Sequence, residues 1–101
     1  RSVQEFIRQL DGVLSSGRPA AVREIVTPQN LKRFITGASF LKDWKTEILR
    51  AEAIDRNRVL VDAHITATTI GGTQASSRAI YMLRRMGERW ILDDIPVFLQ
   101  R

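Results

Sequence analysis

The sequence predicts an α+β fold in which N-terminal helices pack against a four-stranded antiparallel sheet, in the order α-α-α-β-β-β-β. Apolar residues recur at helical spacing through the first third of the chain, whereas the part from Thr46 onward is rich in β-branched and aromatic residues. Short polar or glycine-containing stretches divide that second part into four strand-length segments. A chain of 101 residues has room for one hydrophobic core, so we expect a single domain over residues 1–101.

Composition narrows the class of protein. Apolar residues make up 44% of the chain and charged residues 27%, which is typical of a folded, water-soluble domain. The net charge of +5 is carried mostly by arginines that are scattered along the chain, and the absence of cysteine excludes disulfides and thiolate chemistry. No apolar run approaches the ~20 residues that span a bilayer. The chain begins at Arg1 without an initiator methionine, which favours an exported domain whose N-terminal segment has been removed.

The first helix is marked at both ends. Ser2 followed by Glu5 is a capping-box pattern, and the "SSG" that begins at Ser15 supplies a stop. Between them, one helical face is apolar while the other carries polar residues. The apolar face consists of Val3, Phe6, Ile7, Leu10, Val13 and Leu14.

Two shorter helices follow. Pro19 suits the first turn of a second helix, and Thr27 before Pro28 is a cap that starts a third. We expect Gly37 to end this third helix and the segment through Trp44 to be a packed connection.

Four strands are predicted at residues 46–54, 58–70, 73–86 and 89–97, joined by hairpins. The "GG" at residues 71–72 predicts a two-residue turn, which would place Thr69 opposite Gln74 and Asp62 opposite Tyr81. This register assigns to one face Val59, Val61, Ala63, Ile65, Ile80 and Met82. It assigns to the other face Leu60, Asp62, His64, Ala79, Tyr81 and Leu83.

The last strand follows from a two-residue turn around Gly87. It adds Trp90, Leu92 and Asp94 to the face of Asp62, and it directs Asp93 to the other face. Asp93 and Asp94 would then point to opposite sides of the sheet, so they could not form a catalytic pair of carboxylates.

The chain resembles the nuclear transport factor 2-like superfamily. The resemblance is carried by the opening amphipathic helix, the segments "VTPQNLKRF", "RVLVDAHI" and "RAIYMLRR", and the closing "GERWILDDI". It implies a cone-shaped α+β domain, with a curved antiparallel sheet wrapped around helices and a pocket between them. The superfamily includes ketosteroid isomerases, dehydratases, epoxide hydrolases, transport adaptors and pocket-bearing domains without known activity, so the fold does not decide the function.

Four titratable residues share one face in the predicted register, namely Asp62, His64, Tyr81 and Asp94. If that face lines a cavity under the helices, a carboxylate near a histidine and a phenol could carry out general acid–base catalysis, as in a small isomerase or hydrolase of the ketosteroid-isomerase type. If the more apolar face meets the helices instead, these residues lie on an outer surface. Alternating polar residues on an antiparallel strand favour this second interpretation.

The favoured function is therefore a non-enzymatic domain that binds a small apolar ligand or a protein partner through its pocket or its outer sheet face. Ligand-binding candidates are Tyr81, Trp90 and Leu92. Because both faces carry large apolar side chains and short helices can cover only one, we also expect a homodimer formed through the sheet.

Other site classes have weaker signals. His64 is the single histidine, which predicts no metal site, and no cofactor motif is present. Arg84, Arg85 and Arg89 gather near one turn, but too few aromatic residues accompany them to favour nucleic-acid binding. Asp93 has arginines available on its face, which favours a structural ion pair.

Overall fold

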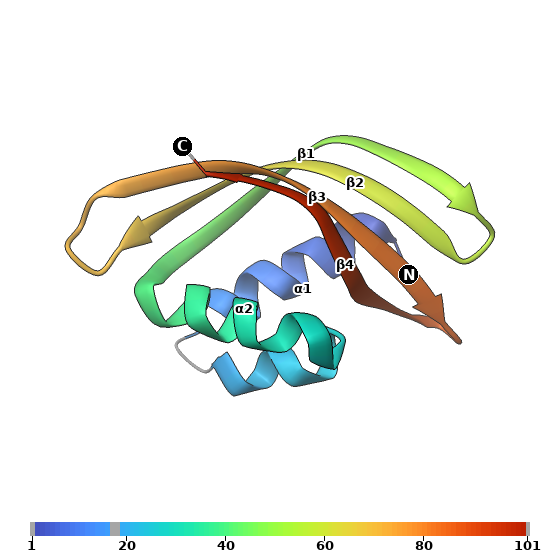
Figure 1. Cartoon of the computed structure of the whole chain (residues 1–101), viewed down its shortest axis with the longest axis horizontal. Helices are drawn as coiled ribbons and strands as arrows, with labels where there is room; N and C mark the ends of the chain where they lie inside the picture. The colour runs from blue at the N-terminus through green and yellow to red at the C-terminus, as the bar shows by residue number, and fades with distance from the viewer. Residues whose placement is uncertain (1, 17–18, 101) are drawn as a thin grey trace.

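The computed structural model describes residues 2–16 and 19–100. Three helical segments lie beneath a four-stranded antiparallel sheet, which arches over them and stays open (Figure 1). The strands follow chain order, β1-β2-β3-β4, so each neighbouring pair is joined by a hairpin. The predicted α+β class, with helices first and four strands after them, is confirmed.

Helix α1 (Val3–Ser15) begins with the predicted capping box. The backbone N–H of Glu5 donates to Ser2 Oγ at 3.1 Å, and the N–H of Ser2 donates to Glu5 Oε1 at 3.2 Å. These bonds satisfy two amides that the first helical turn leaves without partners. The apolar stripe of α1 is buried against the sheet, as its spacing predicts.

The next two segments differ in detail from expectation. The second is a 3₁₀-helix, η1 (Pro19–Glu24), and the third is α2 (Pro28–Phe40), which extends three residues past Gly37. Strand β1 (Leu41–Asp55) begins directly after α2, so the predicted packed connection does not exist. The change of direction is absorbed inside the strand, where Asp43 has a φ of 55° and the pairing with β2 is irregular.

Strands β2 (Arg58–Thr69) and β3 (Gln74–Met86) are joined by a turn that is one residue longer than predicted. Thr69 N–H donates to Thr73 O at 2.8 Å, so the turn consists of residues 70–72, with Gly72 at a φ of 91°. Asp62 therefore pairs with Ile80, not Tyr81, and the predicted register is wrong by one residue. A one-residue slip moves every side chain of one strand to the other face.

The sheet therefore has an inner face towards the helices and an outer face towards solvent. The inner face includes Val61, Ala63, Ile65, Ala79, Tyr81 and Leu83. The outer face includes Leu60, Asp62, His64, Ile80 and Met82. For β2 the favoured interpretation is confirmed, because Asp62 and His64 lie on the outer face. For β3 the predicted faces are exchanged, because Tyr81 lies on the inner face and Ile80 and Met82 lie on the outer face.

Strand β4 (Arg89–Gln100) follows the predicted two-residue turn, with Gly87 at a φ of 66°. Leu83 pairs with Leu92, but Met82 pairs with Asp94, so β4 has an irregularity at Asp93. The expectation that Asp93 and Asp94 point to opposite sides is wrong. Asp94 pairs with the outer-face residue Met82, and Asp93 reaches Arg84 of the same face.

The core fills the space between the inner face and the helices. Its buried members from the helical half are Phe6, Ile7, Leu10, Leu14, Val22, Ile25, Val26 and Phe34. Its buried members from the strands are Trp44, Val61, Ala63, Ile65, Ala67, Ala79, Tyr81, Leu83 and Leu92. In the part of the chain that the structure describes, no helix is long and apolar enough to cross a membrane.

The helical half also covers the two edges of the sheet. At β1, the N–H groups of Trp44 and Thr46 donate to side-chain oxygens of Ser15 and Asp11 on α1, each at 2.8 Å. Such contacts occupy backbone groups that could otherwise pair with another chain.

At β4, residues 25–27 run beside Leu92, whose N–H donates to Ile25 O at 2.8 Å and whose carbonyl accepts from Thr27 N at 3.0 Å. The buried side chain of Asn30 strengthens this junction. It donates to the Asp93 carbonyl at 2.8 Å and to Thr27 Oγ1 at 2.9 Å. The end of η1 is thereby fixed next to β4.

Candidate binding site

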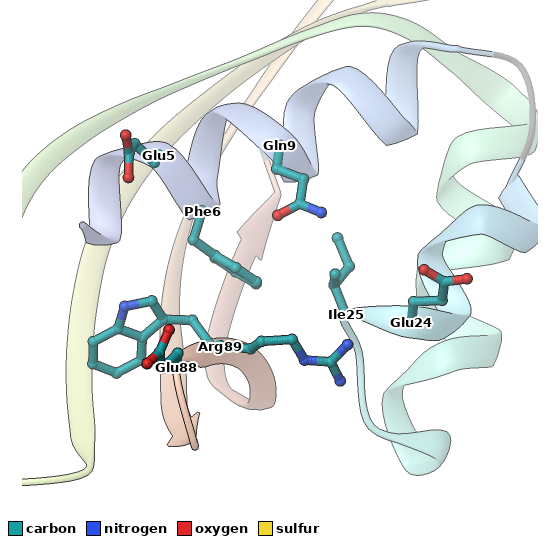
Figure 2. Close-up of a pocket in the computed structure, with 8 residues that line it drawn as sticks. Glu5, Phe6, Gln9, Glu24, Ile25, Glu88 and Arg89 are labelled. Carbon is teal, nitrogen blue, oxygen red and sulfur yellow. The ribbon is translucent and has the colours of Figure 1, made fainter. Parts of the chain in front are cut away.

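A groove of about 480 Å³ opens at one end of the layer between sheet and helices. Three segments that are distant in sequence form it: the N-terminal half of α1, the end of η1, and the turn from β3 into β4 (Figure 2). The residues that line it are Glu5, Phe6, Gln9, Glu24, Ile25, Glu88, Arg89 and Trp90.

One part of the groove is apolar. Phe6 and Ile25 are buried core residues that border it, and Trp90 is partly buried against the same core. The guanidinium carbon of Arg85 lies 5.2 Å from the centre of the Trp90 ring, which is a cation–π contact. Trp90 therefore offers the larger apolar surface to a bound molecule, since Phe6 and Ile25 are only 4% and 7% exposed.

The rest of the lining is charged or polar and comes from all three segments. Glu5 and Gln9 project from α1, Glu24 stands at the end of η1, and Arg89 extends across the groove towards the side of Glu24 (Figure 2). The Glu5 carboxylate is held by the N–H of Ser2 in the capping box. No ion pair joins Arg89 or Glu24 to another residue in the described part of the chain.

The four predicted catalytic residues are not brought together. Tyr81 is 2% exposed on the inner face, with its ring centre 6.2 Å from that of Phe34. Asp62 and His64 lie on the outer face, where Asp62 receives hydrogen bonds from Arg78 Nη2 at 2.8 and 2.9 Å. Asp94 is exposed and pairs with Met82. The sheet therefore lies between the Tyr81 phenol and the side chains of Asp62, His64 and Asp94, which the predicted register had placed on the same face as Tyr81.

The carboxylate of Asp11, on α1, lies on the same side of the sheet as Tyr81. Burial raises the pKa of the Tyr81 phenol, and the negative charge of Asp11 raises it further. Burial also raises the pKa of Asp11, although hydrogen bonds from Thr46 Oγ1 at 2.6 Å and Thr46 N at 2.8 Å act in the opposite direction. Both oxygens of Asp11 are thus engaged in holding α1 to β1. Neither Asp11 nor Tyr81 lines the groove.

The three ligand-binding candidates separate in the same way. Trp90 lines the groove, whereas Tyr81 and Leu92 are core residues. The sequence also missed Glu5, Glu24 and Glu88 as site residues. Glu5 was identified from the sequence as part of the capping box of the first helix, and not as a residue of a binding site. Nothing in the local sequence indicates that the three glutamates approach one groove.

The outer face carries ion pairs and a shallow hollow. Arg84 Nη2 lies 3.3 Å from Asp93 Oδ1, so the ion pair expected at Asp93 is confirmed. A hollow of about 150 Å³ lies over β1, β2 and β3. Its lining residues are Arg50, Glu52, Leu60, Asp62 and Ile80. Among the described residues, no group of three or more histidine, cysteine, aspartate or glutamate side chains could hold a metal ion.

The chain was compared with protein-family models, with curated proteins and with solved structures, and none of these comparisons finds a match.

Proposed function

We propose that the protein is a non-enzymatic binding domain of the nuclear transport factor 2-like type, and that its groove holds a small ligand with an apolar body. The observation that carries the proposal is the groove itself, which joins the apolar surface of Phe6, Ile25 and Trp90 to polar groups from three segments. Its volume of about 480 Å³ lies within the range of about 300–1,000 Å³ that is usual for small-molecule sites.

The positions of the predicted catalytic residues support binding over isomerase-type catalysis, while the titratable groups of the groove itself are Glu5, Glu24 and Glu88. General acid–base chemistry requires a titratable group within hydrogen-bond reach of the reacting atom. Tyr81 is buried, Asp11 is half-buried, and neither lines the groove, whereas the Asp62 carboxylate pairs with Arg78 on the outer face. The element order and the helices beneath an arched sheet support the family assignment (Figure 1).

A variant that fills the groove tests the proposal. Gln9 is exposed and lines the groove, so Gln9→Trp should obstruct it without disturbing the core. Gln4→Trp places the same side chain at an exposed position of α1 outside the lining and serves as the matched control. Binding of 3-phenyl-1-propanol, followed by ligand-observed NMR, should be lost in Gln9→Trp and kept in Gln4→Trp. Equal binding by both variants would refute the groove as the site.

The outer face supports a second proposal, a homodimer formed through the sheet. Leu60, Ile80, Met82 and Ile91 place apolar surface on this face, and the described helices all pack on the other side. Exposed apolar patches of several hundred Å² are unusual on monomers. Light scattering over a dilution series should give a mass near twice 11.5 kDa, with Leu60→Glu shifting it to the monomer. A wild-type mass that stays near 11.5 kDa would exclude the dimer.

A further inference from the structure

The charges of the groove point to the class of its ligand. Resting on the proposed function, we infer that the bound molecule carries a cationic group, an ammonium or a guanidinium, attached to its apolar body.

The lining of the groove is negative in a protein that is positive overall. Glu5, Glu24 and Glu88 contribute three carboxylates, and Arg89 contributes the only cation of the lining, which gives a formal charge of −2. The whole chain has a formal charge of +5. A concave site with low-dielectric walls concentrates such a local field, so the groove attracts cations although the protein as a whole repels them.

Three carboxylates outside the groove form ion pairs with arginines. On the sheet and its hairpins, Asp62 lies 2.8 Å from Arg78, Asp55 lies 2.9 Å from Arg58, and Asp93 lies 3.3 Å from Arg84. These arginines neutralise their partners.

In the groove, neither Glu24 nor Glu88 forms an ion pair with another described residue, although Arg89 follows Glu88 directly in sequence. Glu24 and Glu88 are therefore open to pairing with a cationic ligand.

The apolar part of the groove also suits a cation. Tryptophan is the best aromatic acceptor for a cation–π contact, and Trp90 already receives the guanidinium of Arg85. An organic cation bound here would place its charged group near the carboxylates and its hydrocarbon part against Phe6, Ile25 and Trp90. Arg89 in the lining and Arg85 over Trp90 favour the opposite choice, an anionic ligand, but these two guanidiniums stand against three carboxylates.

Three probes with the same phenylpropyl body separate these possibilities. They are 3-phenylpropyltrimethylammonium, 3-phenyl-1-propanol and 3-phenylpropanoate, and their dissociation constants are measured by NMR titration at low salt. We expect the cation to bind about tenfold more tightly than the alcohol, since each unit of charge contributes on the order of 1 kcal/mol near a protein surface. The carboxylate should bind most weakly, and added salt should reduce the differences.

Each outcome distinguishes the inference from the function on which it rests. If the alcohol binds in the groove as tightly as the cation, the binding function stands and the cation inference is wrong. If the carboxylate binds most tightly, Arg89 sets the preference and the inference is also wrong. If none of the three binds, both proposals fail.

Charge-neutral variants locate the preference. Glu24→Gln with Glu88→Gln removes two exposed carboxylates from the lining and should reduce the ratio of cation affinity to alcohol affinity severalfold. Glu47→Gln removes an exposed carboxylate from β1, outside the groove, and should leave both affinities unchanged. An equal loss of cation affinity in the control would show that overall protein charge is responsible and would overturn the inference.

Discussion

Two adjacent residues of β3 test which face of the sheet meets the helices. Leu83 is 0% exposed on the inner face, and Met82 is partly buried on the outer face. The alanine substitutions Leu83→Ala and Met82→Ala shorten neighbouring side chains by a similar amount. Their effects on the free energy of unfolding should therefore differ only because their surroundings differ.

The expected costs follow from burial. Shortening Leu83 loses about 2.4 kcal/mol of transfer free energy at about 0.8 kcal/mol per carbon group, and the cavity left behind raises the total to about 3–4 kcal/mol. Met82 keeps contact with water and has no layer of the described chain above it, so its truncation should cost about 1 kcal/mol. A difference of about 2–3 kcal/mol corresponds to roughly 8–24 °C in Tm for a domain of this size.

Urea denaturation followed by circular dichroism gives both free energies. The m values of the two variants should agree, which would show that both lose the same folded structure. If Met82→Ala were as costly as Leu83→Ala, or more costly, the helices would pack on the other face of β3 and the register described here would be refuted.

Three further substitutions test the helix–sheet junctions and one turn. Burial raises the pKa of Asp11, so its carboxyl stabilises the fold most at low pH and less as the pH rises through the folded pKa. The stability of Asp11→Asn relative to wild type should therefore increase with pH. A difference in the free energy of urea unfolding that stays constant with pH would contradict this. Gly72→Ala should cost about 1 kcal/mol of stability because φ is 91° at this residue. Gly71→Ala should cost little, because its added Cβ would lie 3.9 Å from the nearest neighbouring atom. Equal Tm values for the two variants would argue against the three-residue turn. Asn30→Ala removes the hydrogen bonds of the Asn30 side chain to the Asp93 carbonyl and to Thr27 Oγ1, and it should cost about 1–3 kcal/mol in the free energy of urea unfolding. An unchanged free energy would refute this prediction.

Local patterns were sufficient for the element types and for much of their order. The capping box at Ser2, the apolar stripe of α1 and the alternation in β2 each depend on residues that are close in sequence, and each predicted its element correctly. The junction of α2 and β1 was missed because Gly37 resembles a helix stop, whereas α2 continues to Phe40, whose side chain is 62% exposed.

The register could not be predicted from the turn sequence alone. Two glycines fit both a two-residue turn and the observed three-residue turn, in which only Gly72 needs a positive φ. That single residue decided whether Tyr81 shared a face with Asp62, and it therefore decided the predicted catalytic cluster.

The groove could not be predicted from local sequence patterns either, because its residues are distant from one another in the sequence. Glu5, Glu24 and Glu88 come from three separate segments and meet only when α1, η1 and the β3–β4 turn are assembled. Trp90 was predicted as a ligand-binding residue because the predicted register placed it on one face with Tyr81 and Leu92.

A map of amide chemical shifts tests whether this groove is the binding site. In a two-dimensional ¹H–¹⁵N titration with 3-phenyl-1-propanol, we predict that the shifts concentrate at residues 5–9, 24–25 and 88–90 and follow one binding curve. Shifts that concentrate instead around Leu60 and Ile80 on the outer face, or that are absent at saturating probe, would contradict the account.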